Sequence, residues 1–382
     1  MAGTGFSQWF WNERFWLPHN TTWADLRNTD EASFPQASDL VMIFPYSIVL
    51  YIIRIFIERL FARPLGRKLN ISDVPNRPPS SNVVLEKVFK TITKNPQGER
   101  LQGLCKQLDW SERQVQRWFR RKRDIDRPSK LVKFSETVWR FIFYVGVFLC
   151  GVALFYGTNC PWKTEICWQG YPEKQMLTPL KYWYYHMELA FYTSCIVSQF
   201  FDVKRKDFWP MCLHHFATIC LIAFSYCINM LNVGGLIMAL HDLSDIFLEG
   251  SKLMKYSKYE SLGTLGLVLF GVSFSLVRLV YFPFWVLYSV YFDAWRIVGA
   301  FPSWYFFCMC LSVLQILHIY WFSFIVKGVM TLWRSGGKVD DERSESECSA
   351  SDEETTVLQH KIEGHGDASS SNGMTLRKHK QT

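Results

Sequence analysis

Five ionisable residues stand close together in two otherwise apolar stretches of the sequence. They are His214, His215, His241, Asp242 and Asp245. A charge at the centre of a bilayer costs at least a few kcal/mol, so such residues in an apolar run are candidates for function. A carboxylate can orient an imidazole, and the imidazole can then act as a general base or as a nucleophile. These residue types therefore predict proton-transfer or acyl-transfer chemistry.

Helical spacing indicates which of these side chains can act together. At about 1.5 Å of rise per residue, His214 lies about 12 Å beyond Lys206 and Asp245 lies about 10 Å beyond Lys252. The two side chains therefore reach similar depths on neighbouring antiparallel helices. His241 and Asp245 share one helix face, because they are four residues apart. We expect a pair between a histidine and an aspartate.

Other interpretations of the same residues exist. A histidine in a membrane span is often only a hydrogen-bonding residue between helices. His214 and His215 point about 100° apart on a helix, so one of them is expected to face a cavity. Three histidines and two aspartates can also bind zinc, but there is no HExxH motif and no pair of histidines four residues apart, so we expect no metal. Glu188 and Arg278, each alone in its stretch, are structural partners or cavity lining.

The elements that must position these residues are apolar blocks of about 20 residues separated by short charged connections. Of the 382 residues, 49% are hydrophobic, yet the mean hydropathy is near zero because polar segments balance the apolar ones. Blocks of this length are typical of transmembrane helices. The sequence predicts an all-α, polytopic membrane bundle of about seven spans. The predicted spans are residues 40–61, 138–156, 182–201, 208–228, 233–251, 262–281 (or to 288) and 303–326, with an eighth span or re-entrant segment at 281–298 as an alternative.

The charges of the chain predict its orientation. Lysine and arginine are concentrated at residues 113–133, 204–206 and 252–258, which the seven-span arrangement places on one side, and such residues usually mark the cytosol. The aromatic-rich segment 1–39 is then lumenal and is expected to lie on the bilayer surface. It contains the glycosylation sequon at Asn20.

Two cysteines differ from the others, most of which lie in apolar runs. Cys160 and Cys167 flank a short polar segment that the orientation places in the lumen. Disulfides persist in oxidising compartments, so these two cysteines are candidates for a pair.

The polar segment 62–130 is predicted to be a cytosolic linker followed by a homeobox-like domain. Residues 111–123 resemble the recognition helix of homeodomains, with earlier helices expected at 84–93 and 98–107. Homeodomains contact adenine through an asparagine on that helix, where this chain has Arg121. We therefore favour a small helical module with a basic face over DNA binding. The basic residues that follow can meet anionic lipid headgroups, at roughly 1 kcal/mol per charge.

The C-terminal segment 333–382 is rich in serine and acidic residues and is predicted to be a disordered cytosolic tail. Ser344, Ser349 and Ser351 each precede an acidic residue by three positions, a pattern that suits an acid-directed kinase such as casein kinase 2. A tail that merely keeps the protein soluble is the alternative.

Several motifs occur in an order that resembles the Lag1 motif of ceramide synthases. They are residues 188–192, 202–208, 213–215, 224–226 and 241–245, and residues 11–18 are similar to the N-terminus of the same family. The resemblance implies a TLC-type membrane domain at 131–332 in the endoplasmic reticulum. It also implies transfer of a fatty acyl chain from acyl-CoA to sphinganine or sphingosine, without a cofactor. The family's functional residues fall on His214, His215, Asp242 and Asp245, and dimers fit the family.

In this family the segment before the last span is linked to the choice of acyl-chain length. Here it comprises Phe292, Asp293, Ala294, Trp295, Arg296, Ile297, Val298 and Gly299. Its form resembles family members that use palmitoyl-CoA, which gives the expected preference of this chain.

The sequence leaves the mechanism open between two routes. One of the adjacent histidines removes a proton from the sphingoid amine, or it accepts the acyl group first. Two other functions remain as alternatives: a non-enzymatic lipid-binding protein of the same fold, and a membrane-tethered transcription regulator.

Overall fold

All regular secondary structure in the described part of the chain is helical, which confirms the all-α prediction. A computed structural model describes residues 5–73, 79–124, 129–200 and 207–334. Contacts divide the chain into two units, Met1–Lys327 and Gly328–Thr382, and only the end of one helix is described in the second unit. The predicted phosphorylation sites Ser344, Ser349 and Ser351 lie outside the described residues.

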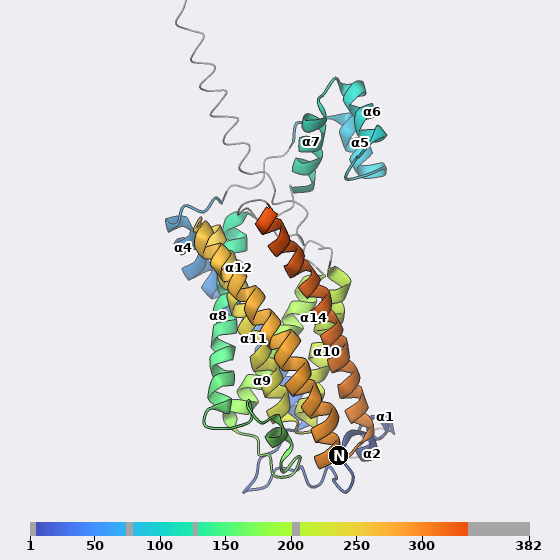
Figure 1. The fold of residues 1–382 in the computed structure, drawn as a ribbon, viewed down its shortest axis with the longest axis vertical. Helices are drawn as coiled ribbons and strands as arrows, with labels where there is room; N and C mark the ends of the chain where they lie inside the picture. The colour runs from blue at the N-terminus through green and yellow to red at the C-terminus, as the bar shows by residue number, and fades with distance from the viewer. Residues whose placement is uncertain (1–4, 74–78, 125–128, 201–206, 335–382) are drawn as a thin grey trace, which may run out of the picture. The chain divides into compact units, whose positions relative to one another are not determined.

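Among the described residues, six helices are long and apolar enough to cross a bilayer (Figure 1). They are Ala37–Lys68, Lys130–Phe155 (α8), Phe208–Cys227 (α10), Leu231–Tyr256 (α11), Glu260–Ile297 and Pro302–Met330, which belongs to α14 (Pro302–Arg334). The first joins a 3₁₀ turn (Ala37–Met42), α3 (Ile43–Phe56), π-helical turns (Ile57–Ala62) and α4 (Arg63–Lys68). In it, Arg54 Nε lies 2.6 Å from Oε1 of Glu58, four residues further along the helix.

The third predicted span, residues 182–201, is not among these six and corresponds to α9 (Pro179–Gln199). This helix is more polar than the other six, since it contains several tyrosines together with His186 and Glu188. Both side chains are nonetheless buried, because α9 packs against α3, α8, α10 and α11. A helix surrounded by other helices can carry polar groups that a lipid-facing helix cannot.

The sixth span is longer than the sequence indicates. The helix runs without a break through α12 (Glu260–Phe274), π-helical segments η4 (Ser275–Leu287) and η5 (Ser289–Asp293), and α13 (Ala294–Ile297). Pro283 lacks an N–H group and would interrupt an ordinary α-helix, but wider π-helical turns continue past it. The expectation of a connecting loop from residue 288 onward is therefore wrong, because only Val298–Phe301 separates the last two spans.

The central helices approach closely where small residues face each other. A Cβ atom added to Gly151 of α8 would lie 2.7 Å from Cβ of Ala239 on α11. No side chain larger than hydrogen fits there, and close approach through small residues is a common way for membrane helices to pack. This contact fixes α11, which carries three of the five predicted site residues.

The N-terminal segment is folded against the end of the bundle and is not simply laid on a membrane surface. It forms α1 (Gly5–Phe10) and α2 (Glu13–Trp16). Trp16 and Leu17 are buried, and the Trp16 ring stacks on Phe224 with 4.7 Å between centroids. The Trp16 carbonyl also accepts a hydrogen bond of 2.9 Å from Ser303 Oγ. The expectation of an interfacial segment is therefore wrong for these residues, because their side chains fill the protein core.

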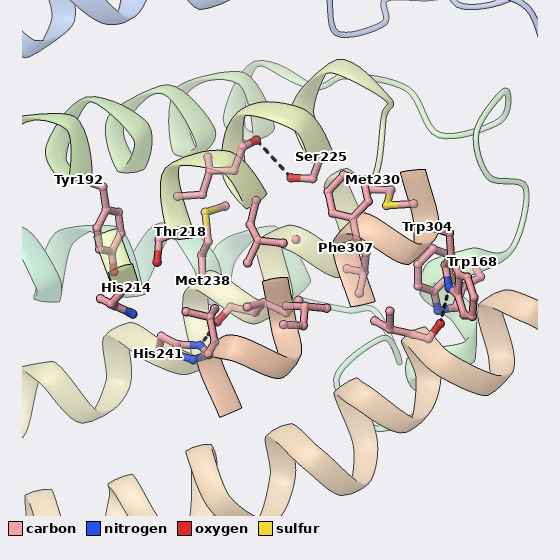
Figure 2. Close-up of a pocket in the computed structure, with 18 residues that line it drawn as sticks. Trp168, Tyr192, His214, Thr218, Ser225, Met230, Met238, His241, Trp304 and Phe307 are labelled. Carbon is pink, nitrogen blue, oxygen red and sulfur yellow. Dashed lines mark hydrogen bonds between the residues drawn. The ribbon is translucent and has the colours of Figure 1, made fainter. Parts of the chain in front are cut away.

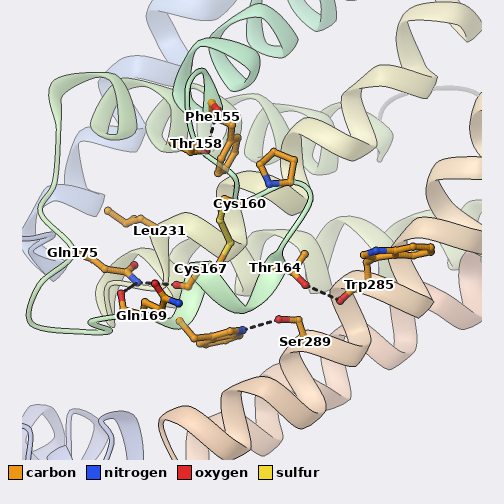
Figure 3. The surroundings of a disulfide bond; sticks show 12 residues. Phe155, Thr158, Cys160, Thr164, Cys167, Gln169, Gln175, Leu231, Trp285 and Ser289 are labelled. Carbon is orange, nitrogen blue, oxygen red and sulfur yellow. Dashed lines mark hydrogen bonds between the residues drawn. A yellow bond between two sulfur atoms is a disulfide. The ribbon is translucent and has the colours of Figure 1, made fainter.

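The connection between α8 and α9 contains a disulfide bond. Cys160 and Cys167 are bonded, with 5.9 Å between their Cα atoms, and a short 3₁₀ helix, Thr164–Trp168, follows the first cysteine (Figure 3). We call residues 156–178 the disulfide loop.

The polar insert folds into three helices around its own core. They are α5 (Val83–Thr91), α6 (Glu99–Leu108) and α7 (Glu112–Asp124), close to the predicted positions. Its buried residues are Leu85, Val88, Leu101, Leu104, Val115, Trp118 and Phe119. The spacing of Val115, Trp118 and Phe119 on one face of α7 is what allows a basic helix to pack in this way.

Candidate active site

A cavity enclosed by the central helices has a mostly apolar lining with polar groups at one end (Figure 2). Its walls come from α9, α10, α11 and α14, with contributions from the disulfide loop and η5. His214, His241, Tyr192 and Thr218 lie at the polar end, and Trp168 and Trp304 lie at the opposite end. Apolar pockets with a few converging polar groups are typical of small-molecule sites.

His214 and His215 occupy different environments, as the 100° separation predicts. The His214 side chain lines the cavity and lies against Trp321, with 5.2 Å between ring centroids. His215 is buried at 8% exposure but is not among the residues that line the cavity, and its ring lies 5.9 Å from that of Tyr192. His214 is therefore the member of the pair that can reach a ligand in this cavity.

His241 is held by two hydrogen bonds. Its Nδ1 atom lies 2.7 Å from the Ile237 carbonyl, and its Nε2 atom lies 3.1 Å from Nε2 of His318. A carbonyl can only accept, so Nδ1 carries the hydrogen in neutral His241 and Nε2 accepts from His318.

His318 is a site residue that the sequence reasoning missed. It lies on α14 and is fully buried at 0% exposure. The sequence did indicate this residue, because a histidine inside an apolar run is a candidate for function by the same argument that applies to His214.

The predicted direct pair between a histidine and an aspartate is absent from the hydrogen bonds of the described residues. Asp245 instead binds Arg278, with 2.9 Å between Oδ2 and Nη2, and the same Nη2 donates to the His241 carbonyl at 2.9 Å. Asp245 therefore acts on the backbone of His241 through Arg278. The guanidinium also lies over the Phe274 ring, 5.0 Å from its centroid.

Asp242 contacts a further set of polar side chains, which come from α9. Its Oδ2 atom accepts a hydrogen bond of 3.4 Å from the Tyr184 hydroxyl, and it lies near the carboxyl group of Glu188. All three side chains are buried. Asp242 and Asp245 are three residues apart and so are neighbours on α11, but each makes its hydrogen bond to a residue of a different helix.

The segment predicted to govern chain length lies in the helix before the last connection. Ala294 is buried, whereas Phe292 and Trp295 are more than half exposed. Arg296 pairs with Asp293 and with Glu165 of the disulfide loop, at 3.2 Å each. None of these residues lines the cavity, but the preceding Val290 does.

The described part of the chain contains no set of side chains that could bind a metal ion. No group of three or more His, Cys, Asp or Glu side chains there lies close enough to hold an ion.

Comparison with known proteins identifies the family. The TLC domain matches residues 133–327 and the homeodomain matches residues 79–127. Human ceramide synthase 5 is 42% identical over 367 residues, which cover 96% of this chain and 92% of that protein. The chain belongs to the ceramide synthase family. Human ceramide synthase 4 is 38% identical over 360 residues (94% and 91% covered), and human ceramide synthase 3 is 41% identical over 324 residues (84% of each). In this member of the family, the TLC match contains every residue of the cavity.

Proposed function

We propose that this chain is an acyl-CoA-dependent N-acyltransferase that joins a fatty acyl chain to a sphingoid base and forms ceramide or dihydroceramide. The observation that carries the proposal is the cavity, which is apolar along its length and has His214 and His241 at one end. An acyl chain needs an apolar enclosure, and its thioester needs a group that moves protons or attacks a carbonyl. Membership of the ceramide synthase family supports the same substrates.

The geometry supports a direct route of acyl transfer. The acyl chain lies along the apolar walls with its carbonyl at the histidine end. The amine nitrogen of the sphingoid base attacks the carbonyl carbon, the C–N bond forms and the C–S bond breaks. His214 accepts the proton that the amine loses and gives it to the sulfur, so coenzyme A leaves as the thiol.

A two-step route uses the same residues. An imidazole nitrogen of His214 attacks the thioester and forms an acyl-imidazole while coenzyme A leaves. The amine then attacks this intermediate and releases the histidine. Incubation with acyl-CoA alone, followed by mass spectrometry of the peptide that contains His214, separates the routes. An acylated peptide supports the two-step route, and its absence under turnover-competent conditions supports direct transfer.

The position of the disulfide loop supports the proposed orientation in the membrane. A disulfide persists in an oxidising compartment, so in this proposal the Trp168 end of the cavity faces the lumen of the endoplasmic reticulum. His214 is six residues from the beginning of α10 at Phe208, on the opposite side. The soluble coenzyme A moiety then approaches from the cytosol, while the acyl chain points toward the lumen.

The assay for this function is N-acylation of a labelled sphingoid base by membranes that contain the protein. A series of acyl-CoA thioesters is tested, with His214→Ala run at matched protein levels. Activity that His214→Ala removes is the expected result. Absence of activity with every acyl-CoA, from folded protein, would overturn the proposal and favour a lipid-binding protein without catalysis.

The same series tests the expected preference for palmitoyl-CoA. That preference derives from the segment 292–299, and the names of the relatives, ceramide synthases 3, 4 and 5, do not support one chain length. A maximum at another length would show that this segment does not determine the preference in the expected way.

A further inference from the structure

The end of the cavity opposite the histidines is closed by two tryptophans from distant parts of the chain. Trp168 comes from the disulfide loop and Trp304 from the beginning of α14 (Figure 2). Trp168 is 1% exposed and Trp304 is 7% exposed, so neither ring opens to the outside. Between this end and His214 the walls are aliphatic or aromatic apart from Thr218 and Ser225.

Both tryptophan rings are fixed by hydrogen bonds to the same short segment. Trp168 Nε1 donates to Ser289 Oγ at 3.0 Å, and Trp304 Nε1 donates to the Val290 carbonyl at 2.8 Å. A buried indole N–H needs a partner, so these bonds determine the orientation of each ring. The residues at the far end of the cavity therefore cannot turn aside without losing a buried hydrogen bond.

The disulfide loop is attached on two sides of the cavity. Toward the turn between α10 and α11, Asn229 Nδ2 donates to the carbonyls of Pro172 and Gln175, at 2.7 Å each, and the Tyr171 hydroxyl donates to the Ile228 carbonyl at 3.0 Å. The loop thus crosses the end of the helices whose residues form one wall of the cavity.

Toward the π-helical segment, the loop makes a second set of contacts. Thr164 Oγ1 donates to the Trp285 carbonyl at 3.4 Å (Figure 3). The Tyr281 hydroxyl donates to the Pro161 carbonyl. Both contacts come from residues between the two bonded cysteines, and the second cysteine, Cys167, directly precedes Trp168.

We propose that Trp168 is a specificity-determining residue that ends the acyl cavity, and that the Cys160–Cys167 disulfide holds it in place. The inference rests on the proposed function and adds to it the residue at which the acyl chain must stop. His214 and Ser225 are eleven residues apart on α10, so the apolar wall between them extends about 16 Å at the helix rise of 1.5 Å per residue. An acyl chain longer than the space in front of Trp168 has no room for its last carbons.

We expect kcat/KM to depend strongly on the length of the acyl chain. In apolar pockets, one methylene changes kcat/KM by about 10-fold to 200-fold. Removal of the indole ring opens space at the end of the cavity. The kcat/KM for longer acyl chains should therefore rise, and the kcat/KM for chains that fitted before should fall because they lose contacts with the ring. The ratio of kcat/KM for two chain lengths measures this effect independently of how much enzyme is folded.

Trp168→Ala is the test variant, and Trp162→Ala is the matched control. Trp162 lies in the same loop but is 79% exposed and does not line the cavity. Membranes with each variant receive saturated acyl-CoA thioesters from fourteen to twenty-four carbons in competition, and the ceramides are separated by mass. We expect Trp168→Ala to raise the ratio of longer to shorter products by about 10-fold or more, and Trp162→Ala to leave it unchanged.

Two further variants test the remaining parts of the proposal. Trp168→Phe keeps most of the ring but loses the bond to Ser289, so a smaller shift in the same direction is expected. Cys160→Ser with Cys167→Ser releases the loop and is expected to broaden the range of accepted chains. If the unmodified protein is active and Trp168→Ala leaves the product ratio unchanged, the role of Trp168 is overturned but the proposed function is not. An unmodified protein inactive on all thioesters would instead overturn the proposed function.

Discussion

The Nε2 atom of His241 lies 3.1 Å from the Nε2 atom of His318, although 77 residues separate the two in the chain. Because the Ile237 carbonyl takes the hydrogen of His241 Nδ1, the imidazole of His318 must be the donor between them. The Ile237 carbonyl thereby sets the tautomer of His241, and His318 helps to fix its ring orientation at the polar end of the cavity. We regard His318 as a positioning residue, since it does not line the cavity itself.

Replacement of His318 tests this relationship. His318→Leu leaves Nε2 of His241 buried without a donor, and an unpaired buried group costs about 1–3 kcal/mol. We expect kcat to fall roughly 10-fold, corresponding to about 1.4 kcal/mol, with little change in KM for acyl-CoA. His318→Gln retains an N–H donor and should recover part of the loss. The exposed neighbour Ile319, changed to alanine, is the control. Equal losses in the leucine and glutamine variants would contradict a role in hydrogen bonding.

The two adjacent histidines should differ in their importance. Because His214 lines the cavity and His215 does not, His214→Ala should lower kcat by about 10²-fold or more, as expected for loss of an acid–base group. His215→Ala should affect activity less at equal protein amount. Steady-state rates with membranes normalised by immunoblot measure both. A larger loss for His215 would place the chemistry on the other face of α10.

Part of the site was predictable from local sequence alone. An apolar run with two histidines identifies a helix and a functional position, and helix geometry separates His214 from His215. The shared face of His241 and Asp245 also follows from their spacing. These features depend only on residues within one or two helical turns.

The partners across helices could not be read from the sequence. Arg278 and His318 reach His241 from two other helices, and their pairing depends on how α11, η4 and α14 are rotated and shifted. Pro283 suggested a helix end, yet π-helical turns carry the helix past it. The cavity end at Trp168 requires a loop from before α9 to meet residues from beyond α12, which no local pattern encodes.

Removal of the Arg278 side chain should destabilise the protein. Arg278→Met leaves the partly buried Asp245 carboxylate without its cation and removes one of the donors to the His241 carbonyl, which keeps the Ser244 hydroxyl at 3.1 Å. Breaking a fully buried ion pair costs about 3–5 kcal/mol, and this partly exposed pair should cost less. We expect a lower thermal unfolding temperature in detergent and less protein in the membrane. Arg278→Met combined with Asp245→Asn removes both charges and should be less destabilised than the sum of the single variants. Additive losses would show that the two side chains are not coupled.

Glycosylation tests the orientation of the whole bundle. Asn20 is exposed in the turn that follows the buried Trp16 and Leu17, and Asn70, in a second sequon, is exposed at the end of α4. Exposure therefore does not distinguish the two sites, but an odd number of spans between them places them on opposite sides of the membrane. Only a lumenal asparagine meets the glycosylation machinery, so Asn20→Gln should abolish the mobility shift on endoglycosidase treatment. Asn70→Gln should leave the shift unchanged. A glycan on Asn70 would reverse the orientation and place the Trp168 end of the cavity in the cytosol.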